Sequence, residues 1–226
     1  MLRNKWSNIS QPSNKDLSAS PNLEVERILL FIDQYLPSFP DYYKSVKDSE
    51  RENRISDILV HHLQLCKTEY NGGLIPFDFR KNPTQPHSSK ETDIGVFTLS
   101  RDKQLRPIIE FEAKRFSQYS NNKEYVCGIR GGIERFKRGD HSSQLKTCGM
   151  FAYIQKPTTE TWINKVNTWI SELSLNNADA TIDWTNQKEI LKKVQTFQGI
   201  EKLSSSHSRK KLKDFISLWH YFIDLN

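Results

Sequence analysis

The chain has little of several features that assign a protein to a class at once. Its 226 residues include only three cysteines, Cys66, Cys127 and Cys148, which are widely spaced and form no Cys-x-x-Cys pair. This argues against a disulfide scaffold or a zinc knuckle and fits a reducing compartment. No apolar run reaches the roughly 18 residues of a membrane span, and the N-terminus lacks the apolar core of a signal peptide. Glycine-rich nucleotide loops and internal repeats are also missing. We therefore expect a soluble cytoplasmic protein with no membrane partner.

The composition indicates a polar, basic, globular chain. Hydrophobic residues make up 36% of the sequence and charged residues 27%, which allows a substantial core. The net charge of +6 and the pI near 9.1 favour a polyanionic partner. We expect a flexible arm over residues 1–20 and a single domain over 21–226. The core of this domain covers about 48–155, and an extension of helices and strands covers 156–226.

Residues 91–115 predict two strands joined by a turn. Residues 92–99 are short and β-branched, residues 100–104 have turn composition, and residues 107–114 form the second strand. Side chains alternate between the two faces of a strand. One face of the second strand then carries Ile109, Phe111 and Ala113, and the other carries Ile108, Glu110, Glu112 and Lys114. Asp93 on the first strand adds a third acid that can meet this polar face.

Three acids and a lysine at one point suit phosphodiester chemistry. Hard divalent cations such as Mg²⁺ bind one or two carboxylates together with water and substrate phosphate. A lysine beside them can orient the attacking water and offset charge that builds on the phosphate. The alternative is a surface strand on which Glu110, Glu112 and Lys114 are solvated charges in cross-strand pairs.

An acid on one strand followed by Glu112-Ala113-Lys114 on the next resembles the PD-(D/E)xK nuclease superfamily, although Thr92 stands where the family name has proline. The resemblance implies an α/β, restriction-endonuclease-like fold with a mixed central sheet flanked by helices. It implies that Asp93 and Glu112 bind Mg²⁺, for which Mn²⁺ can substitute, that Glu110 and Glu52 are additional metal ligands, and that Lys114 positions the water.

Glu52 has two interpretations. An acid on the first helix of these nucleases often approaches the metal, and Glu52 lies on a predicted helix over 48–66. However, Ser49 and Glu52 also have the spacing of a capping box, in which the two residues cap the helix reciprocally. We favour the capping role slightly.

Two basic segments are candidates for binding the nucleic-acid backbone. A predicted helix over 125–138 carries Arg130, Arg135 and Lys137, whose alternative role is a solvated basic face. The segment 207–211 adds His207 and Arg209, and its alternative role is to solubilise the start of the next helix.

The remaining elements complete an α/β pattern. Helices are predicted over 20–36, 158–175 and 215–225, strands over 74–79, 148–154 and 196–206, and a short helix or turn over 188–194.

By the resemblance, we expect a metal-dependent DNA endonuclease, in bacterial anti-phage defence or restriction, acting as a homodimer or with a partner defence subunit. The alternative is a non-catalytic nucleic-acid-binding or scaffolding subunit that keeps the fold.

Overall fold

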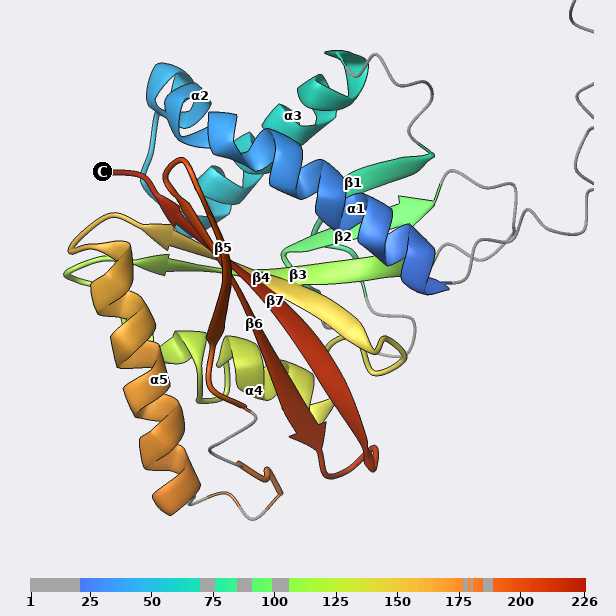
Figure 1. Ribbon diagram of the computed structural model, residues 1–226, viewed down its shortest axis with the longest axis vertical. Coiled ribbons are helices and arrows are strands. Elements are labelled where there is room, and N and C mark those ends of the chain that lie inside the picture. Colours follow the sequence, from blue (N-terminus) through green and yellow to red (C-terminus); the bar gives the residue numbers. More distant parts are fainter. Residues whose placement is uncertain are drawn as a thin grey trace, which may run out of the picture.

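A mixed β-sheet of seven strands runs through the middle of the protein, in the order β1-β2-β3-β4-β7-β6-β5 (Figure 1). The computed structural model describes residues 21–69, 76–84, 91–98, 106–176, 179, 181–184 and 189–226. Helices cover both faces of the sheet, with α1, α2 and α3 on one side and α4 and α5 on the other (Figure 1). The α/β class expected from the sequence is therefore confirmed, while the predicted arm over residues 1–20 lies outside the described residues.

The helical layer on the first face begins at Pro21. It comprises α1 (Pro21–Tyr35), the short 3-10 helix η1 (Leu36–Ser38), α2 (Phe39–Val46) and α3 (Glu52–Glu69). Pro37 and Pro40 end α1, as expected, but each also lies in the first turn of a following helix, where proline is tolerated because its missing N–H has no intrahelical partner. The sequence prediction missed these two elements.

The first half of the sheet is an antiparallel meander followed by a parallel crossover. Its strands are β1 (Phe77–Lys81), β2 (Ile94–Thr98) and β3 (Pro107–Phe116). The predicted hairpin is thus confirmed, although its turn over 100–104 lies outside the described residues. The chain then crosses through η2 (Asn122–Tyr125) and α4 (Gly132–Arg138) to β4 (Thr147–Ile154), which pairs with β3 in parallel.

The helix predicted over 125–138 is half as long as expected. Gly128 has a φ of 107°, which is incompatible with an α-helix, and a Cβ at Gly131 would lie 2.4 Å from the Cys127 carbonyl carbon. The two glycines therefore form a bend that separates η2 from α4, and only the last seven residues are α-helical.

The second half of the sheet contains the largest correction. After α5 (Thr159–Leu175) come β5 (Lys192–Phe197), β6 (Ile200–Arg209) and β7 (Asp214–Asp224). The helix predicted over 215–225 is wrong, because this segment is β7, which pairs with β4 in parallel and with β6 antiparallel. Likewise, Lys192–Val194 belong to β5 rather than to a helix or turn, and a turn at Gly199, with a φ of 72°, splits the strand predicted over 196–206.

Two hydrophobic clusters hold the helices to the sheet. On the α1–α3 face, Phe111 of β3 stacks on Phe151 of β4, with 4.7 Å between the ring centroids. On the α4–α5 face, Phe116 packs against Trp162 and Phe222. Since Phe111 faces the first cluster, its neighbours on β3 face α4. None of the helices in the described ranges has the length and apolar character needed to cross a membrane.

Candidate active site

Asp93 and Glu112 meet where β2 begins. The register of the hairpin pairs Gly95 with Glu110 and Ile94 with Phe111. Continuing it by one residue places Asp93 opposite Glu112, on the same face of the sheet. Asp93 Oδ2 also accepts a hydrogen bond from the Ala113 backbone N–H at 2.6 Å. The first predicted acid is therefore fixed beside the Glu-x-Lys segment.

Glu112 lies at the centre of the cluster and is only 1% exposed. Its Oε1 accepts hydrogen bonds from Lys114 Nζ at 3.1 Å and from Arg135 Nη1. Its Oε2 is buried and has no hydrogen-bond partner among the described residues. Buried polar atoms are nearly always satisfied in folded proteins. One oxygen of the central carboxylate is therefore available for a ligand.

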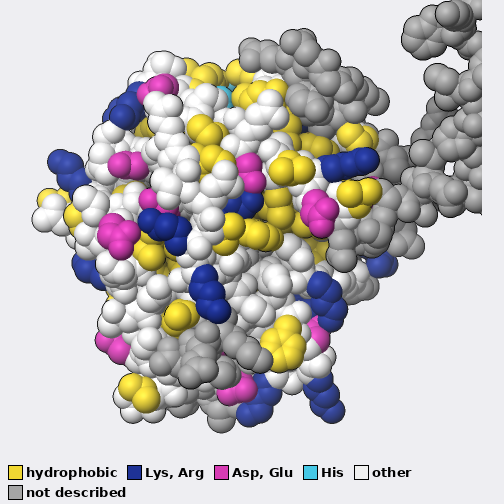
Figure 2. Space-filling model, viewed as in Figure 1, with side chains coloured by type: hydrophobic (Ala, Val, Ile, Leu, Met, Phe, Trp, Pro, Cys, Tyr) yellow, Lys and Arg dark blue, Asp and Glu magenta, His cyan; other side chains and the backbone are white. Residues whose placement is uncertain are grey.

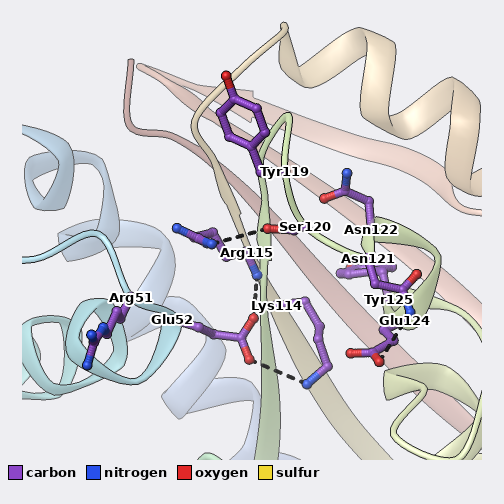
Figure 3. Close-up of a pocket in the computed structure, with 10 residues that line it drawn as sticks. All are labelled: Arg51, Glu52, Lys114, Arg115, Tyr119, Ser120, Asn121, Asn122, Glu124 and Tyr125. Atoms are coloured by element: carbon purple, nitrogen blue, oxygen red, sulfur yellow. Dashed lines mark hydrogen bonds and ion pairs between the residues drawn. The ribbon is translucent and has the colours of Figure 1, made fainter.

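Lys114 joins this carboxylate to Glu52 on α3. Its Nζ lies 3.6 Å from Glu52 Oε1, and Glu52 Oε2 accepts a hydrogen bond from the Arg115 N–H at 2.7 Å (Figure 3). The capping-box role that we favoured for Glu52 is wrong, because α3 begins at Glu52 itself and its first backbone bonds go to Arg51. The Glu52 side chain instead ties the start of α3 to the C-terminal end of β3.

Burial and repulsion determine the protonation of the acids. Burial, together with the negative charge of Glu112, raises the pKa of Asp93 to about 6, although Lys114 lowers it in part. Burial likewise raises the pKa of Glu52, against the opposing effect of Lys114. Glu112 is the nearest acid to Lys114 and binds it directly.

Lys114 remains a cation in this environment. Burial lowers the pKa of Lys114, but the carboxylates of Glu112, Glu52 and Asp93 outweigh that effect, and the net pKa is raised. Lys114 contacts both Glu112 and Glu52, and Arg135 contacts Glu112 as well.

A cavity of about 370 Å³ opens beside Glu52 and Lys114. It is lined by Arg51, Glu52, Lys114, Arg115, Tyr119, Ser120, Asn121, Asn122, Glu124 and Tyr125 (Figure 3). The sequence analysis singled out only Glu52 and Lys114 from this set. For most of the others the one local signal is their position: Arg115 follows Lys114 on β3, and the lining residues from Tyr119 to Tyr125 come shortly after that strand, where the chain turns away from the sheet.

Glu110 is not part of this cluster. It is buried on the same face of β3, where Thr92 Oγ1 donates to one carboxylate oxygen at 3.0 Å and Ser142 Oγ donates to the other. The structure thus brings the predicted metal ligand Glu110 to two hydroxyl groups rather than to Asp93. Its role here is to link β3 to the start of β2 and to the loop before β4.

The structure separates the predicted backbone-binding residues into two groups. Arg135 reaches the site through its bond to Glu112, and Arg130 is exposed at the bend before α4. The other three are interior. Lys137 pairs with Glu189 at 2.5 Å, with both side chains 1% exposed.

His207 and Arg209 are also buried, at 0% and 1% exposure. His207 bonds Ser205 at 2.6 Å, and Arg209 forms two bonds to Asp214, at 2.6 and 2.7 Å. These side chains and Lys137 stabilise the sheet and do not present a surface for DNA. The three predictions are wrong because each basic group has an internal partner that removes it from solvent.

The carboxylates at the site could supply only part of the ligands of a divalent cation. Within the described part of the chain, no group of three or more His, Cys, Asp or Glu side chains is close enough to hold a metal ion. The four-acid set expected from the sequence therefore does not converge. Asp93 and Glu112 remain, and one or two carboxylates with water and substrate phosphate are sufficient for Mg²⁺. The unpartnered Glu112 oxygen fits this requirement.

Surface charge gives little further guidance. On the face seen in Figure 2, basic and acidic side chains are interspersed and form no continuous basic patch. No protein-family model matches the chain, and neither curated protein sequences nor solved structures include a significant match. The geometry of the site is therefore the basis for assigning a function.

Proposed function

We propose that this chain is a Mg²⁺-dependent nuclease of the PD-(D/E)xK type that hydrolyses phosphodiester bonds in DNA. The observation that carries the proposal is the position of Asp93 beside Glu112, whose second oxygen lacks a donor, with the Lys114 ammonium 3.1 Å from its first oxygen. These are the residues that a metal-assisted phosphodiesterase requires, at one end of two adjacent strands.

The order of elements around the site supports this class. A helix, three antiparallel strands, a helix and a fourth strand parallel to the third follow one another as α3, β1, β2, β3, α4 and β4. This order resembles the core of the restriction-endonuclease-like fold. Asp93 directly precedes the second strand and Glu112 lies on the third, in line with the resemblance.

Each side chain has a distinct role in the proposed reaction. Asp93 and Glu112 would hold the metal, which when bound polarises the phosphate and stabilises the negative charge of the transition state. Lys114 Nζ donates a hydrogen bond to the attacking water and keeps it in line with the phosphorus. Arg135 fixes the Glu112 carboxylate and adds positive charge beside the phosphate. Glu52 holds Lys114 in place from the opposite side.

A second candidate is a non-catalytic nucleic-acid-binding or scaffolding subunit. The observation that favours it is that Lys114 and Arg135 already pair with Glu112 and that, among the described residues, no three acids are close enough to hold a metal ion together. Ion pairs of this kind can stabilise a fold without catalysis.

Cleavage assays distinguish the two candidates. Linear and supercoiled DNA are incubated with Mg²⁺, Mn²⁺ or EDTA and with wild type, Lys114→Ala or Glu112→Gln. Lys44→Ala, which removes an exposed lysine on α2, is the matched control. We expect metal-dependent cutting by wild type and Lys44→Ala and a loss of at least 100-fold in both site variants, on the order of one catalytic group. Cutting that survives in Lys114→Ala contradicts the proposed site, and binding without cutting by wild type favours the second candidate.

A further inference from the structure

A rigid loop follows the motif strand directly. We call residues 117–122 the ridge. Its two ends are joined because Asn122 Oδ1 accepts from the Ser117 N–H at 3.1 Å and Asn122 Nδ2 donates to the Ser117 carbonyl at 2.8 Å. Ser117 Oγ bonds Ser120 Oγ at 2.6 Å, and Arg115 Nη2 donates to Ser120 Oγ at 3.3 Å. Side chains therefore fix the ridge in one conformation beside the candidate site.

The ridge carries an aromatic side chain in solvent. Tyr119 is 91% exposed, although its backbone N–H bonds Ser117 Oγ. In Figure 3 its ring extends away from Lys114 and Glu52. Because the Tyr119 ring projects from the ridge into solvent, it is not part of either hydrophobic cluster. It is, however, the arrangement that proteins use to stack a nucleic-acid base.

A second cavity, of about 410 Å³, lies on the other side of the ridge. It is lined by Ser117, Gln118, Asn122, Lys156, Pro157, Trp162 and Lys165. Asn122 lines both cavities, so they adjoin at the ridge.

The lining of the second cavity is positively charged. It contains two lysines and no carboxylate, and within the described part of the chain neither lysine forms an ion pair. Lys165 Nζ lies 4.4 Å from the Trp162 ring centroid, and the Trp162 indole donates to the Lys156 carbonyl at 3.1 Å. Two unneutralised ammonium groups beside amide and hydroxyl donors match the chemistry of a phosphate.

We propose that Tyr119 and the second cavity bind an unpaired nucleic-acid strand next to the bond that is cut. This inference rests on the proposed function, since it gives that nuclease a substrate class. The scissile phosphate lies at Lys114, a neighbouring base stacks on Tyr119, and a further phosphate lies between Lys156 and Lys165. A base in a duplex has both faces covered by its neighbours, so stacking on Tyr119 requires single-stranded DNA or a frayed end.

Binding measurements under conditions that prevent cleavage test this inference. Fluorescence anisotropy in EDTA is used to measure the Kd for a labelled 20-nucleotide single strand and for the duplex of the same sequence. The protein variants are Tyr119→Ala, Tyr119→Phe and the double variant Lys156→Ala/Lys165→Ala. Lys44→Ala/Lys192→Ala is the charge-matched control, because both of its lysines are exposed on other elements. The replaced side chains of Tyr119, Lys156 and Lys165 are exposed, and thermal unfolding checks that each variant keeps the fold.

We expect Tyr119→Ala to weaken single-strand binding about tenfold, because one base loses its stacking partner, whereas Tyr119→Phe keeps it. The double lysine variant is expected to weaken binding and to reduce the slope of log K against log salt by about 0.7, the value for the one phosphate that lies between the two lysines. The control variant and duplex binding change little.

Four results would overturn the inference: no effect of Tyr119→Ala on the single strand, an equal loss on the duplex, an equal effect of the control lysines, or equal competition by a glutamate-rich peptide. Failure of the proposed function is seen separately. Single-strand binding that depends on Tyr119 without any cutting supports this inference and removes the nuclease. Cutting that does not depend on Tyr119 retains the nuclease and removes this inference.

Discussion

The raised pKa of Asp93 makes a prediction about folding stability. The pKa of Asp93 is about 6 in the folded protein, against 3.8 for an ordinary aspartate, because of burial and the neighbouring Glu112. Between these values the folded state holds a proton that the unfolded state has released. Stability therefore falls as pH rises through this interval.

The size of the effect follows from the same two values. A pKa difference of about 2 corresponds to about 3 kcal/mol, at 1.36 kcal/mol for each pH unit. Asp93→Asn removes the titrating group, while the amide oxygen can still accept from the Ala113 N–H. We expect the variant to match wild type near pH 4 and to exceed it in free energy of unfolding by up to about 3 kcal/mol at pH 7.

Urea unfolding followed by circular dichroism in EDTA, at intervals from pH 4 to 7.5, measures this difference. Asp41→Asn, at an exposed position on α2, is the matched control for the loss of one carboxylate. If the difference in free energy of unfolding between Asp93→Asn and wild type stays constant from pH 4 to 7.5, or falls as pH rises, the reasoning about burial and repulsion at the site is refuted.

Three further predictions concern other parts of the molecule. Lys137→Met should lower the free energy of unfolding at pH 7 by about 3–5 kcal/mol in urea titrations, because it leaves the Glu189 carboxylate buried without its cation; a loss below 1 kcal/mol would mean that water reaches the pair. Gly149→Ala should lower the free energy of unfolding by about 1–3 kcal/mol in the same assay, because its Cβ would lie 2.3 Å from the Phe111 ring. Adding Phe111→Leu should restore part of this loss of stability, and no recovery would place the strain elsewhere. Adding 10 mM MgCl₂ should raise the Tm of wild type in thermal melts but not that of Asp93→Asn, and equal increases would place the cation at another site.

The sequence was sufficient to locate the pair of acids, because the information for it is local. Strand alternation put Glu112 and Lys114 on one face of β3, and a short connection limited the hairpin to an antiparallel register that brings Asp93 alongside. The contact of Glu52 with β3 is not local, since 63 residues separate Glu52 from Arg115. Whether Glu52 caps α3 or reaches the candidate site depends on where α3 begins. The exact ends of helices are poorly defined by the sequence.

The terminal strand was missed for a different reason. Residues 215–225 are mostly apolar, interrupted by Ser217, His220 and Asp224, and such a segment fits either a helix or a strand that is buried on both faces. In β7, Leu218 and Phe222 face one hydrophobic cluster while Trp219 and Tyr221 face the other. The pairings with β6 and with β4, which lies about 70 residues earlier in the chain, distinguish the two alternatives.

The misplaced basic residues follow from the usual expectation that charged side chains are exposed. Lys137 and Arg209 are exceptions because Glu189 and Asp214 compensate for their burial. Arg209 and Asp214 are the last residue of β6 and the first of β7, directly on either side of the hairpin turn and five residues apart, and that spacing is the one local signal for their pairing.

The way the two halves of the sheet are joined has a consequence for folding kinetics. Strands β1 to β4 pair with their neighbours in sequence, and so do β5 to β7, and the parallel pairing of β4 with β7 connects the two sets. That pairing brings Thr147 to Ser217 and closes a segment of about 70 residues. Non-local parallel pairings form slowly, because chain entropy is lost before the contacts are gained. The hairpin that carries Asp93 and Glu112 can therefore form early in refolding, while closure between β4 and β7 limits the rate at which the complete sheet appears.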